Sequence, residues 1–350
     1  MSIDLKQFVD VDIQRHITSE IEATRPTAVL FANTADKESA VYESFDKVEE
    51  QYTKKDAVYK YAKIYFDNGG LKLNVIEKTA ALTKDLIIAL DNKCICIAYA
   101  SDAANYDTMK SIAESLANDT SIYGINEKIL LARTESDKDD SIKNFAVKYS
   151  TVVGAEMTIA AYLSKINCYG IDSIYDYMFT EEKSITAENI NTETYKSIIN
   201  HSINVDIAFA NVTRNCGGNC KNGDDLVNNY CRIVLCQTLT DRLVQLLTQK
   251  IKSSTGVSKM YAVVAQELDR YLQAGYLTTD KIWPDDWTID YNGRKYTIIE
   301  KGTALINGYI IQIMPFSVKT NDIVHEAPPI YIALADQYGI RKITLEGSIS

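Results

Sequence analysis

Cys94-Ile-Cys-Ile-Ala-Tyr-Ala100 is a short apolar run between two helical patterns, which cover residues 80–90 and 106–116. An apolar run of this length, bounded by helical periods, is typical of a strand that is buried on both faces of a sheet. Similar runs occur before and after it, at residues 27–32, 71–76 and 128–132, and residues 54–66 have a helical period. Strands that alternate with helices predict βαβ units and a largely parallel sheet covered on both faces. We therefore expect an α/β domain, which continues through helices at about 139–149 and 152–164.

The second half of the chain has a different pattern. Residues 189–211 are polar and mixed, and residues 216–224 are rich in Gly and Asn, so we expect a domain boundary near residue 200. Two helical patterns follow, at residues 226–252 and 258–272. Asn292-Gly293 is a strong hairpin signal, and further strand-like runs cover 287–291, 295–300, 309–315 and 330–335. These features predict an α+β domain with a mostly antiparallel sheet over residues 201–338, after an α/β domain over 25–200.

The two ends of the chain have strand patterns without a local partner. Val9, Val11 and Ile13 alternate with polar residues, and Ile343 and Leu345 form a similar apolar face. Neither run is joined to a neighbouring strand by a hairpin turn. We expect residues 1–24 and 339–350 to form extended arms that add strands to other subunits. The alternative is that both strands close the sheet of their own subunit.

Composition excludes several classes of protein. The 350 residues carry a formal net charge of −10, which disfavours general binding to nucleic acid because that needs a clustered basic surface. No apolar stretch has the length needed to span a bilayer, so we expect no membrane insertion. Seven cysteines, together with a polar N-terminal segment, favour reduced thiols and assembly in the cytoplasm.

The sequence offers no recognisable catalytic or cofactor site. Neither G-x-G-x-x-G nor G-x-x-x-x-G-K-[ST] occurs, so no turn is equipped to bind a phosphate. Four cysteines are conceivable zinc ligands, but their spacing is irregular and free thiols are the better interpretation: Cys216, Cys220, Cys231 and Cys236. The three histidines are isolated in the sequence. We therefore expect no cofactor, no metal and no enzymatic activity.

Two blocks of the sequence resemble a known family. The first is Ser44-Phe-Asp-Lys-Val-Glu-Glu50, with Ala57-Val-Tyr-Lys-Tyr-Ala-Lys-Ile-Tyr-Phe-Asp-Asn-Gly-Gly70 and the following strand. It resembles the helix, Phe-x-Asn-Gly-Gly turn and strand of contractile phage tail sheath proteins. The second runs from Gly223 through the two long helical patterns to Gly275-Tyr-Leu-Thr-Thr. Later strands, around 307–315, 327–329 and 343–347, are similar to the family's last strands, so the resemblance covers most of the chain in the family's order.

The resemblance implies a structural subunit of a phage tail or of a phage-tail-like bacteriocin particle. Such a subunit assembles with itself into stacked hexameric rings around a tail tube protein, through N- and C-terminal arms, and contracts without a bound nucleotide. The baseplate and tail terminator proteins are the other implied partners. The chain is short for this family, which implies few outer decorations. The alternatives are another tail component, from the tube or the baseplate, or a small-molecule-binding α/β protein or enzyme with an unrecognised site.

One segment of the second half is positively charged within an acidic chain. Arg232, Arg242, Lys250 and Lys252 lie in the helical pattern 226–252, and Asp241 is the single acid within that segment. Given the resemblance, these four basic residues are the candidates for a tube-facing surface. The alternative is a solvated helix face with basic residues near its C-terminal end.

Overall fold

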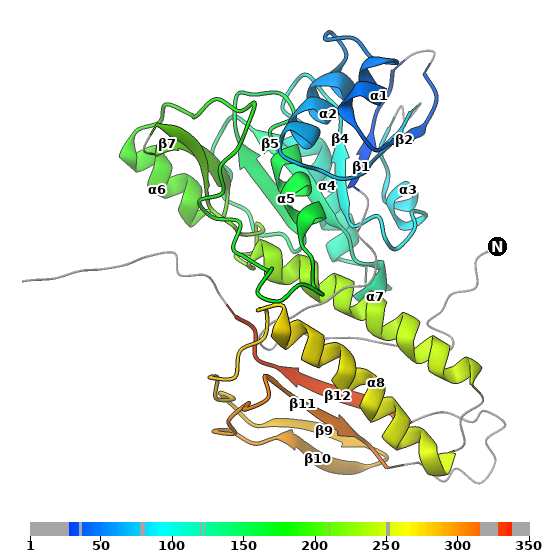
Figure 1. Cartoon of the computed structure of the whole chain (residues 1–350). Coiled ribbons are helices and arrows are strands. Elements are labelled where there is room, and N and C mark those ends of the chain that lie inside the picture. The colour runs from blue at the N-terminus through cyan, green and yellow to red at the C-terminus, as the bar shows by residue number, and fades with distance from the viewer. Residues whose placement is uncertain are drawn as a thin grey trace, which may run out of the picture.

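An eight-stranded sheet forms the larger part of the molecule (Figure 1). The computed structural model describes residues 28–34, 37–77, 81–119, 121–122, 124–209, 211–249, 253–315 and 328–337. Strands follow the order β2-β3-β1-β4-β5-β6-β7-β8, and the six central strands are mutually parallel. The edge strands β2 and β8 are antiparallel to their neighbours. The strands are β1 (Ala28–Phe31), β2 (Ala40–Tyr42), β3 (Leu73–Ile76), β4 (Cys96–Tyr99), β5 (Ile129–Thr134), β6 (Phe145–Tyr149), β7 (Asn204–Phe209) and β8 (Val212–Cys216).

Helices cover both faces of this sheet because its strands are apolar on both sides. In β1, Ala28 and Leu30 point into one core, whereas Val29 and Phe31 point into the other. The first core also contains side chains of α2 (Ala57–Asp67), α5 (Met157–Lys165) and α7 (Leu226–Thr248). The second core contains side chains of α3 (Lys84–Ile88), α4 (Tyr106–Ala117) and α6 (Thr192–Asn200). The short elements α1 (Phe45–Glu49) and η2 (Gly124–Asn126) complete this α/β part.

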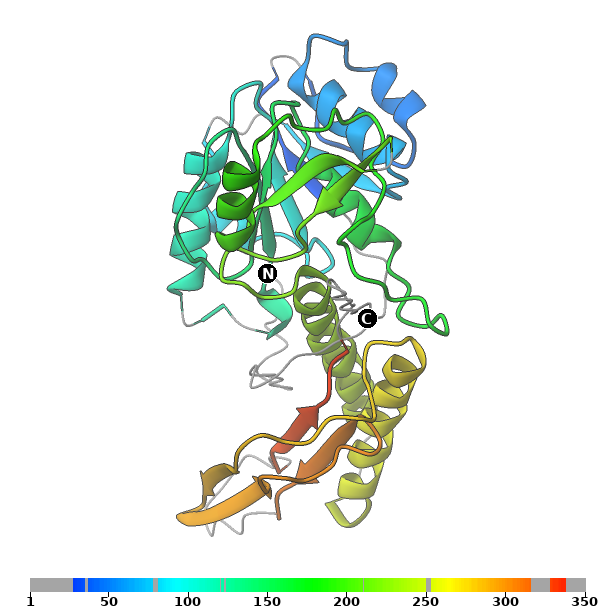
Figure 2. The same ribbon diagram turned by 90° about the vertical axis from the view of Figure 1, so that its left-hand side faces the viewer.

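The remaining elements form a smaller part below the sheet. Helix α7 lies between the sheet and α8 (Ser253–Gln273), and two small antiparallel sheets lie beyond α8 (Figures 1 and 2). The first pairs β9 (Trp287–Tyr291) with β10 (Arg294–Ile299), and the second pairs β11 (Tyr309–Ile313) with β12 (Ile330–Leu334). Leu268 and Tyr271 of α8 belong to the same core as the first face of the large sheet. A continuous apolar core therefore joins the two parts through α7.

The mixed α/β class with a mostly parallel sheet and small antiparallel sheets is confirmed, but two details of the prediction are wrong. Residues 145–149 form strand β6 rather than part of a helix. Phe145 and Val147 enter one core and Ala146 enters the other, so this run is buried on both faces and its period cannot separate helix from strand. The sheet also continues past the boundary expected near residue 200, because β7 and β8 pair onto β6. The predicted hairpin at Asn292-Gly293 is confirmed by β9 and β10.

Gly154 is the point at which the turn before α5 approaches α2. Its φ is +84°, and a Cβ there would lie 3.0 Å from the backbone Cα of Tyr61. We expect Gly154→Ala to lower the free energy of unfolding by about 2 kcal/mol or more, because backbone strain and a clash with main chain add together. Gly293→Ala is the matched control, since its φ is +73° with nothing within 4 Å of the added Cβ. Urea denaturation of both variants measures the difference, and equal losses would contradict this account.

Candidate functional site

Helix α7 is the connection between the two parts of the molecule. Its N-cap, Asp225, accepts a hydrogen bond from the backbone N–H of Asn228 at 2.9 Å, which fixes the first turn. From Leu226 to Cys236 every side chain is buried, whereas most of the last turns are partly or fully exposed. A helix that is apolar on all sides is buried within a protein, so these turns of α7 belong to the core that joins the two parts.

The structure gives Arg232 an internal role. Its side chain is 4% exposed and pairs with Glu127, which is also 4% exposed and lies just after η2. Burial by itself raises the pKa of Glu127, but Arg232 outweighs it and, with Lys143 and Asn144, brings that pKa down to about 2. Arg232 therefore holds α7 against the large sheet and does not face outward, which removes it from the predicted tube-facing set.

Arg242 has a partner as well. Its Nε lies 2.9 Å from Oε1 of Glu267, a residue of α8 whose side chain is 1% exposed. Arg270 contacts the same carboxylate at 3.1 Å. Arg242 is half-buried between the two helices, so its charge stabilises the α7–α8 contact. Lys250 and Lys252 lie outside the described residues, as do Val9, Val11, Ile13, Ile343 and Leu345 of the two predicted arms.

A charge reversal at Arg242 is expected to destabilise the subunit itself. Glu at this position would bring a second carboxylate next to buried Glu267, so we expect Arg242→Glu to lower the free energy of unfolding by about 2 kcal/mol. Lys259→Glu is the matched control, because Lys259 lies exposed on the same α7–α8 hairpin and the charge change is identical. Thermal denaturation compares them. A stability of Arg242→Glu equal to that of the control would show that the ion pair contributes nothing.

The lower part presents features that suit contact with other chains. Each of its four strands has one ladder partner among the described residues, and an isolated two-stranded sheet is marginally stable in water. Ile282 and Ile306 are 65% and 72% exposed, on segments joined by the bridge between Ile282 and Ala304. Unpaired strand edges beside exposed apolar side chains are typical of surfaces that become covered on association.

No arrangement for metal binding or nucleophilic catalysis emerges in the described ranges. Cys216, Cys220, Cys231 and Cys236 are buried free thiols, and no group of three or more His, Cys, Asp or Glu side chains there is placed to hold a metal ion. A pocket of about 210 Å³ lies beside the start of α7 and is lined by Asp172, Asp176 and Asp225 with Tyr175, Asn228 and Tyr276. Its described lining contains no histidine, cysteine, serine or lysine. Over the same ranges, no helix has the length and hydropathy needed to cross a membrane.

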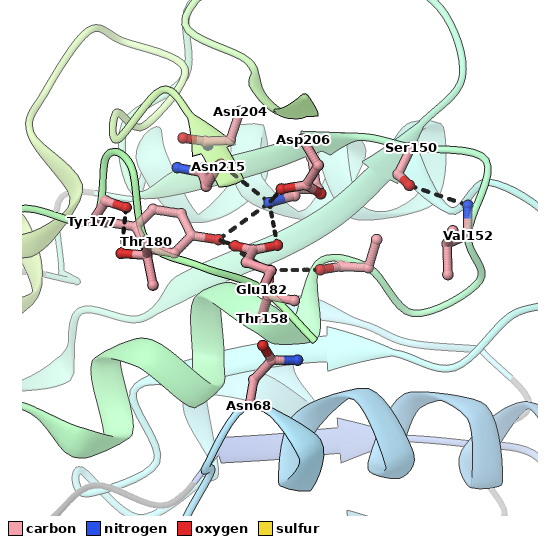
Figure 3. A network of polar contacts seen from close by, with 12 residues as sticks. Asn68, Ser150, Val152, Thr158, Tyr177, Thr180, Glu182, Asn204, Asp206 and Asn215 are labelled. Carbon is pink, nitrogen blue, oxygen red and sulfur yellow. Dashed lines mark hydrogen bonds and ion pairs between the residues drawn. The ribbon is translucent and has the colours of Figure 1, made fainter. Parts of the chain in front are cut away.

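A buried polar cluster around Lys148 was not predicted from the sequence (Figure 3). The ammonium group of Lys148 donates hydrogen bonds to Asp206 Oδ1 at 2.7 Å, Glu182 Oε2 at 2.8 Å and Asn215 Oδ1 at 3.1 Å. Tyr177 donates its hydroxyl proton to Glu182 as well. All these side chains are buried, and none of them lines either described pocket. A cluster so isolated from solvent has no access for an external substrate.

Comparisons with known proteins identify the fold. No family model and no curated protein matches the sequence. Solved structures do match: a chain of the anti-feeding prophage baseplate aligns with a TM-score of 0.65 and 14% identity, over 98% of each chain. A chain of the PVC extracellular contractile injection system, from the sheath complex in the contracted state, aligns with a TM-score of 0.64 and 13% identity, over 97% of each chain. The sheath tail protein of Desulfitobacterium hafniense aligns with a TM-score of 0.53 and 8% identity, over 78% of this chain and 91% of that one.

The chain thus has the fold of contractile injection system and phage tail sheath proteins over almost its whole length. Both parts of the molecule, and not the α/β part alone, are included in that similarity. The resemblance of the two sequence blocks to contractile tail sheath proteins is therefore confirmed at the level of the fold.

Proposed function

We propose that this chain is the structural subunit of a contractile tail sheath. It polymerises as stacked hexameric rings around a tail tube and contracts to drive the tube through a target cell envelope. The observation that carries the proposal is the similarity to chains of contractile sheath structures over 97% of the chain, which includes helix α7 and the small sheets. The particle is a phage tail or a phage-tail-like bacteriocin, and it is assembled in the bacterial cytoplasm.

The distribution of charge supports an orientation within the particle. Acidic residues outnumber basic residues over residues 28–225, whereas the two are equal in number over residues 226–337. An acidic surface repels copies of itself and favours contact with water, whereas a surface without net charge associates more readily. We therefore place the α/β part outward and the lower part, with α8 and the small sheets, toward the tube and the neighbouring subunits.

The terminal arms are the proposed connections between subunits. Residues 1–24 and 339–350, with the apolar faces at Val9, Val11, Ile13, Ile343 and Leu345, would add strands to neighbouring copies. The strands β9 to β12 offer edges for such addition, because each has one ladder partner among the described residues. Backbone hydrogen bonds along an added strand hold subunits together while their domains rotate.

A second role within the same particle is supported by the similarity to a baseplate chain. The chain that aligns over 98% of this protein was solved as part of a baseplate. A sheath-like subunit that sits at the baseplate end of the tail is therefore the alternative. The two roles differ in stoichiometry, since a sheath subunit polymerises without limit along the tail and a baseplate component closes as a ring.

Sedimentation of the purified protein tests the proposal. We expect it to form large assemblies whose average mass rises with protein concentration, because polymerisation of a sheath subunit is driven by mass action. A ring of fixed mass at all concentrations would favour the baseplate role. A monomer at all concentrations would contradict both.

A further inference from the structure

Three neighbouring strands bring a lysine, a carboxylate and a carboxamide onto one face of the large sheet. Lys148 of β6 pairs in register with Asn204 of β7, and Asp206 lies two residues further along β7 on the same face. Asn215 of β8 lies directly opposite Asp206. Lys148, Asp206 and Asn215 are each 0% exposed. The three side chains therefore converge in a site that water does not reach, as Figure 3 shows for Asp206 and Asn215.

The contacts of the amine exceed what an ammonium group can satisfy. Its nitrogen lies 2.7–3.1 Å from oxygen atoms of Asp206, Glu182 and Asn215, and 3.3 Å from the hydroxyl of Tyr177. Four acceptors face three N–H protons. Two atoms of the same cluster, Oδ2 of Asp206 and Nδ2 of Asn215, are buried without a hydrogen-bond partner. Unpartnered buried polar atoms are unfavourable and call for a specific explanation.

We propose that Lys148 and Asn215 form an intramolecular isopeptide bond, with Asp206 as the group that transfers the proton. The amine of Lys148 contacts both the carboxamide of Asn215 and the carboxyl group of Asp206, and Asp206 lies opposite Asn215 in the β7–β8 ladder. The Asn215 carbonyl carbon lies within about 4.3 Å of the Lys148 nitrogen, because the hydrogen bond to Oδ1 and one C=O length set the upper limit. Reactants held in contact react with the advantage of a very high effective concentration.

The reaction balances without an external reagent. Lys148 first gives one ammonium proton to a neighbouring carboxylate, and the neutral Nζ attacks Cγ of Asn215. Asp206 delivers a proton to Nδ2, which is the unpartnered atom, as the Cγ–Nδ2 bond breaks. A second proton from Nζ returns to the carboxylates. The products are an Nζ–Cγ amide and one molecule of ammonia, and nothing is oxidised or reduced.

The pKa shifts of the groups in the cluster are compatible with this order of reaction steps. Burial raises the pKa of Asp206 well above its ordinary value, and the nearby Glu182 adds to this effect while Lys148 opposes it, which favours the protonated acid that the transfer needs. Burial acts to lower the pKa of Lys148, but Asp206 and Glu182 together raise it above its ordinary value. The neutral amine is thus a minor form. An irreversible step with loss of ammonia nevertheless draws the cluster to the linked product.

The bond would connect the β7–β8 hairpin, at the edge of the large sheet, to strand β6. Strand β8 is held by β7, and β7 shares a short ladder with β6. A covalent link from β6 to β8 would prevent the hairpin from separating from the sheet under load. It would also replace a buried ammonium ion with a neutral amide, which removes the desolvation penalty of the charge. The value of the link under load rests on the proposed sheath function, whereas its formation does not.

Mass spectrometry of the purified, denatured full chain tests the inference. We expect the intact mass to be lower than that of the sequence by one ammonia, and a proteolytic digest to contain a branched peptide that joins Lys148 to Asn215. A full sequence mass with an unlinked Lys148 peptide would overturn the proposal. A mass lower by one water, with Lys148 joined to Asp206, would overturn the assignment of Asn215 as the acceptor.

Two variants separate the chemistry from the fold. We expect no link in Lys148→Arg, and a link that forms at least about 100-fold more slowly in Asp206→Asn, because general acid catalysis is lost. Lys128→Arg is the matched control, since Lys128 is a largely buried lysine that donates to the backbone oxygen of Asp91. The control should retain the link. Since the mass is read in denaturant, a variant that folds poorly still reports whether the link formed, and a link that survives in Lys148→Arg would contradict the assignment.

Discussion

Replacing Arg232 with Ala is expected to lower the free energy of unfolding by about 3–5 kcal/mol, the largest loss that we predict for a single side chain. The variant leaves the carboxylate of Glu127 buried without its main counter-ion, because Lys143 and Asn144 are the contacts that remain for it among the described residues. It also removes the contact that fastens α7 to the start of β5. Chemical denaturation at neutral pH measures the loss.

The pH dependence of this variant gives a second readout. The pKa of Glu127 is about 2 in the folded protein, below its ordinary value of 4.5. A carboxyl whose folded pKa is depressed stabilises the fold above its unfolded pKa, and this stabilisation is lost as the pH falls from 4.5 to about 2. The difference between the parent protein and Arg232→Ala should therefore be largest at neutral pH and shrink through this range.

A double variant distinguishes the lost charge pair from lost packing. Arg232→Met with Glu127→Gln removes both charges and keeps similar volumes, so we expect it to recover most of the stability. If Arg232→Ala unfolds with the same free energy as the parent protein, the pair does not hold α7 in place, and the role given to this helix is wrong.

Removing residues 1–17 is expected to abolish assembly while leaving the subunit folded. The three described apolar clusters are built entirely from residues between 28 and 335, so the deletion takes nothing from them. Strand addition by Val9, Val11 and Ile13 would be lost, and subunits would remain monomeric. Sedimentation reports assembly, and the thermal midpoint reports the fold. A truncated protein that unfolds or aggregates would show that this strand belongs to its own subunit.

Point variants give this deletion a matched control. Replacing Val9, Val11 and Ile13 with Asn keeps the length of the segment but removes its apolar face. Replacing Asp10 and Asp12 with Asn changes the other face of the same strand pattern. We expect the first set to prevent assembly and the second to permit it, and the reverse result would contradict strand addition through the apolar face.

Local patterns in the sequence predict four strands of the α/β part, because each of these strands is a short apolar run bounded by helical patterns. The apolar runs at β1, β3, β4 and β5 and the Asn292-Gly293 hairpin are found where the patterns place them. Strand β6 is predicted as part of a helix, since a run buried on both faces has no period that excludes a helix. Helix α6 and β7 lie in a polar stretch, and their apolar side chains become evident only when Ile198 and Val205 enter the second core.

The buried charges could not be predicted from the sequence, because their partners are far apart along the chain. Lys148 meets Glu182, Asp206 and Asn215 across separations of 34, 58 and 67 residues. Arg232 meets Glu127 across 105 residues. Most of these residues have the sequence surroundings of a solvated polar group. Lys148 differs, because it follows the apolar run Phe145-Ala-Val147, and a polar residue in such a run is the one local signal that a buried partner is present.

Cryo-electron microscopy of the purified full-length protein tests the central claim most directly. The account predicts tubes with helical order, in which every subunit has this fold, the α/β part lies outside, and residues 1–24 and 339–350 add strands to neighbouring subunits. Compact particles of one or a few chains, at concentrations where sheath subunits polymerise, would contradict it.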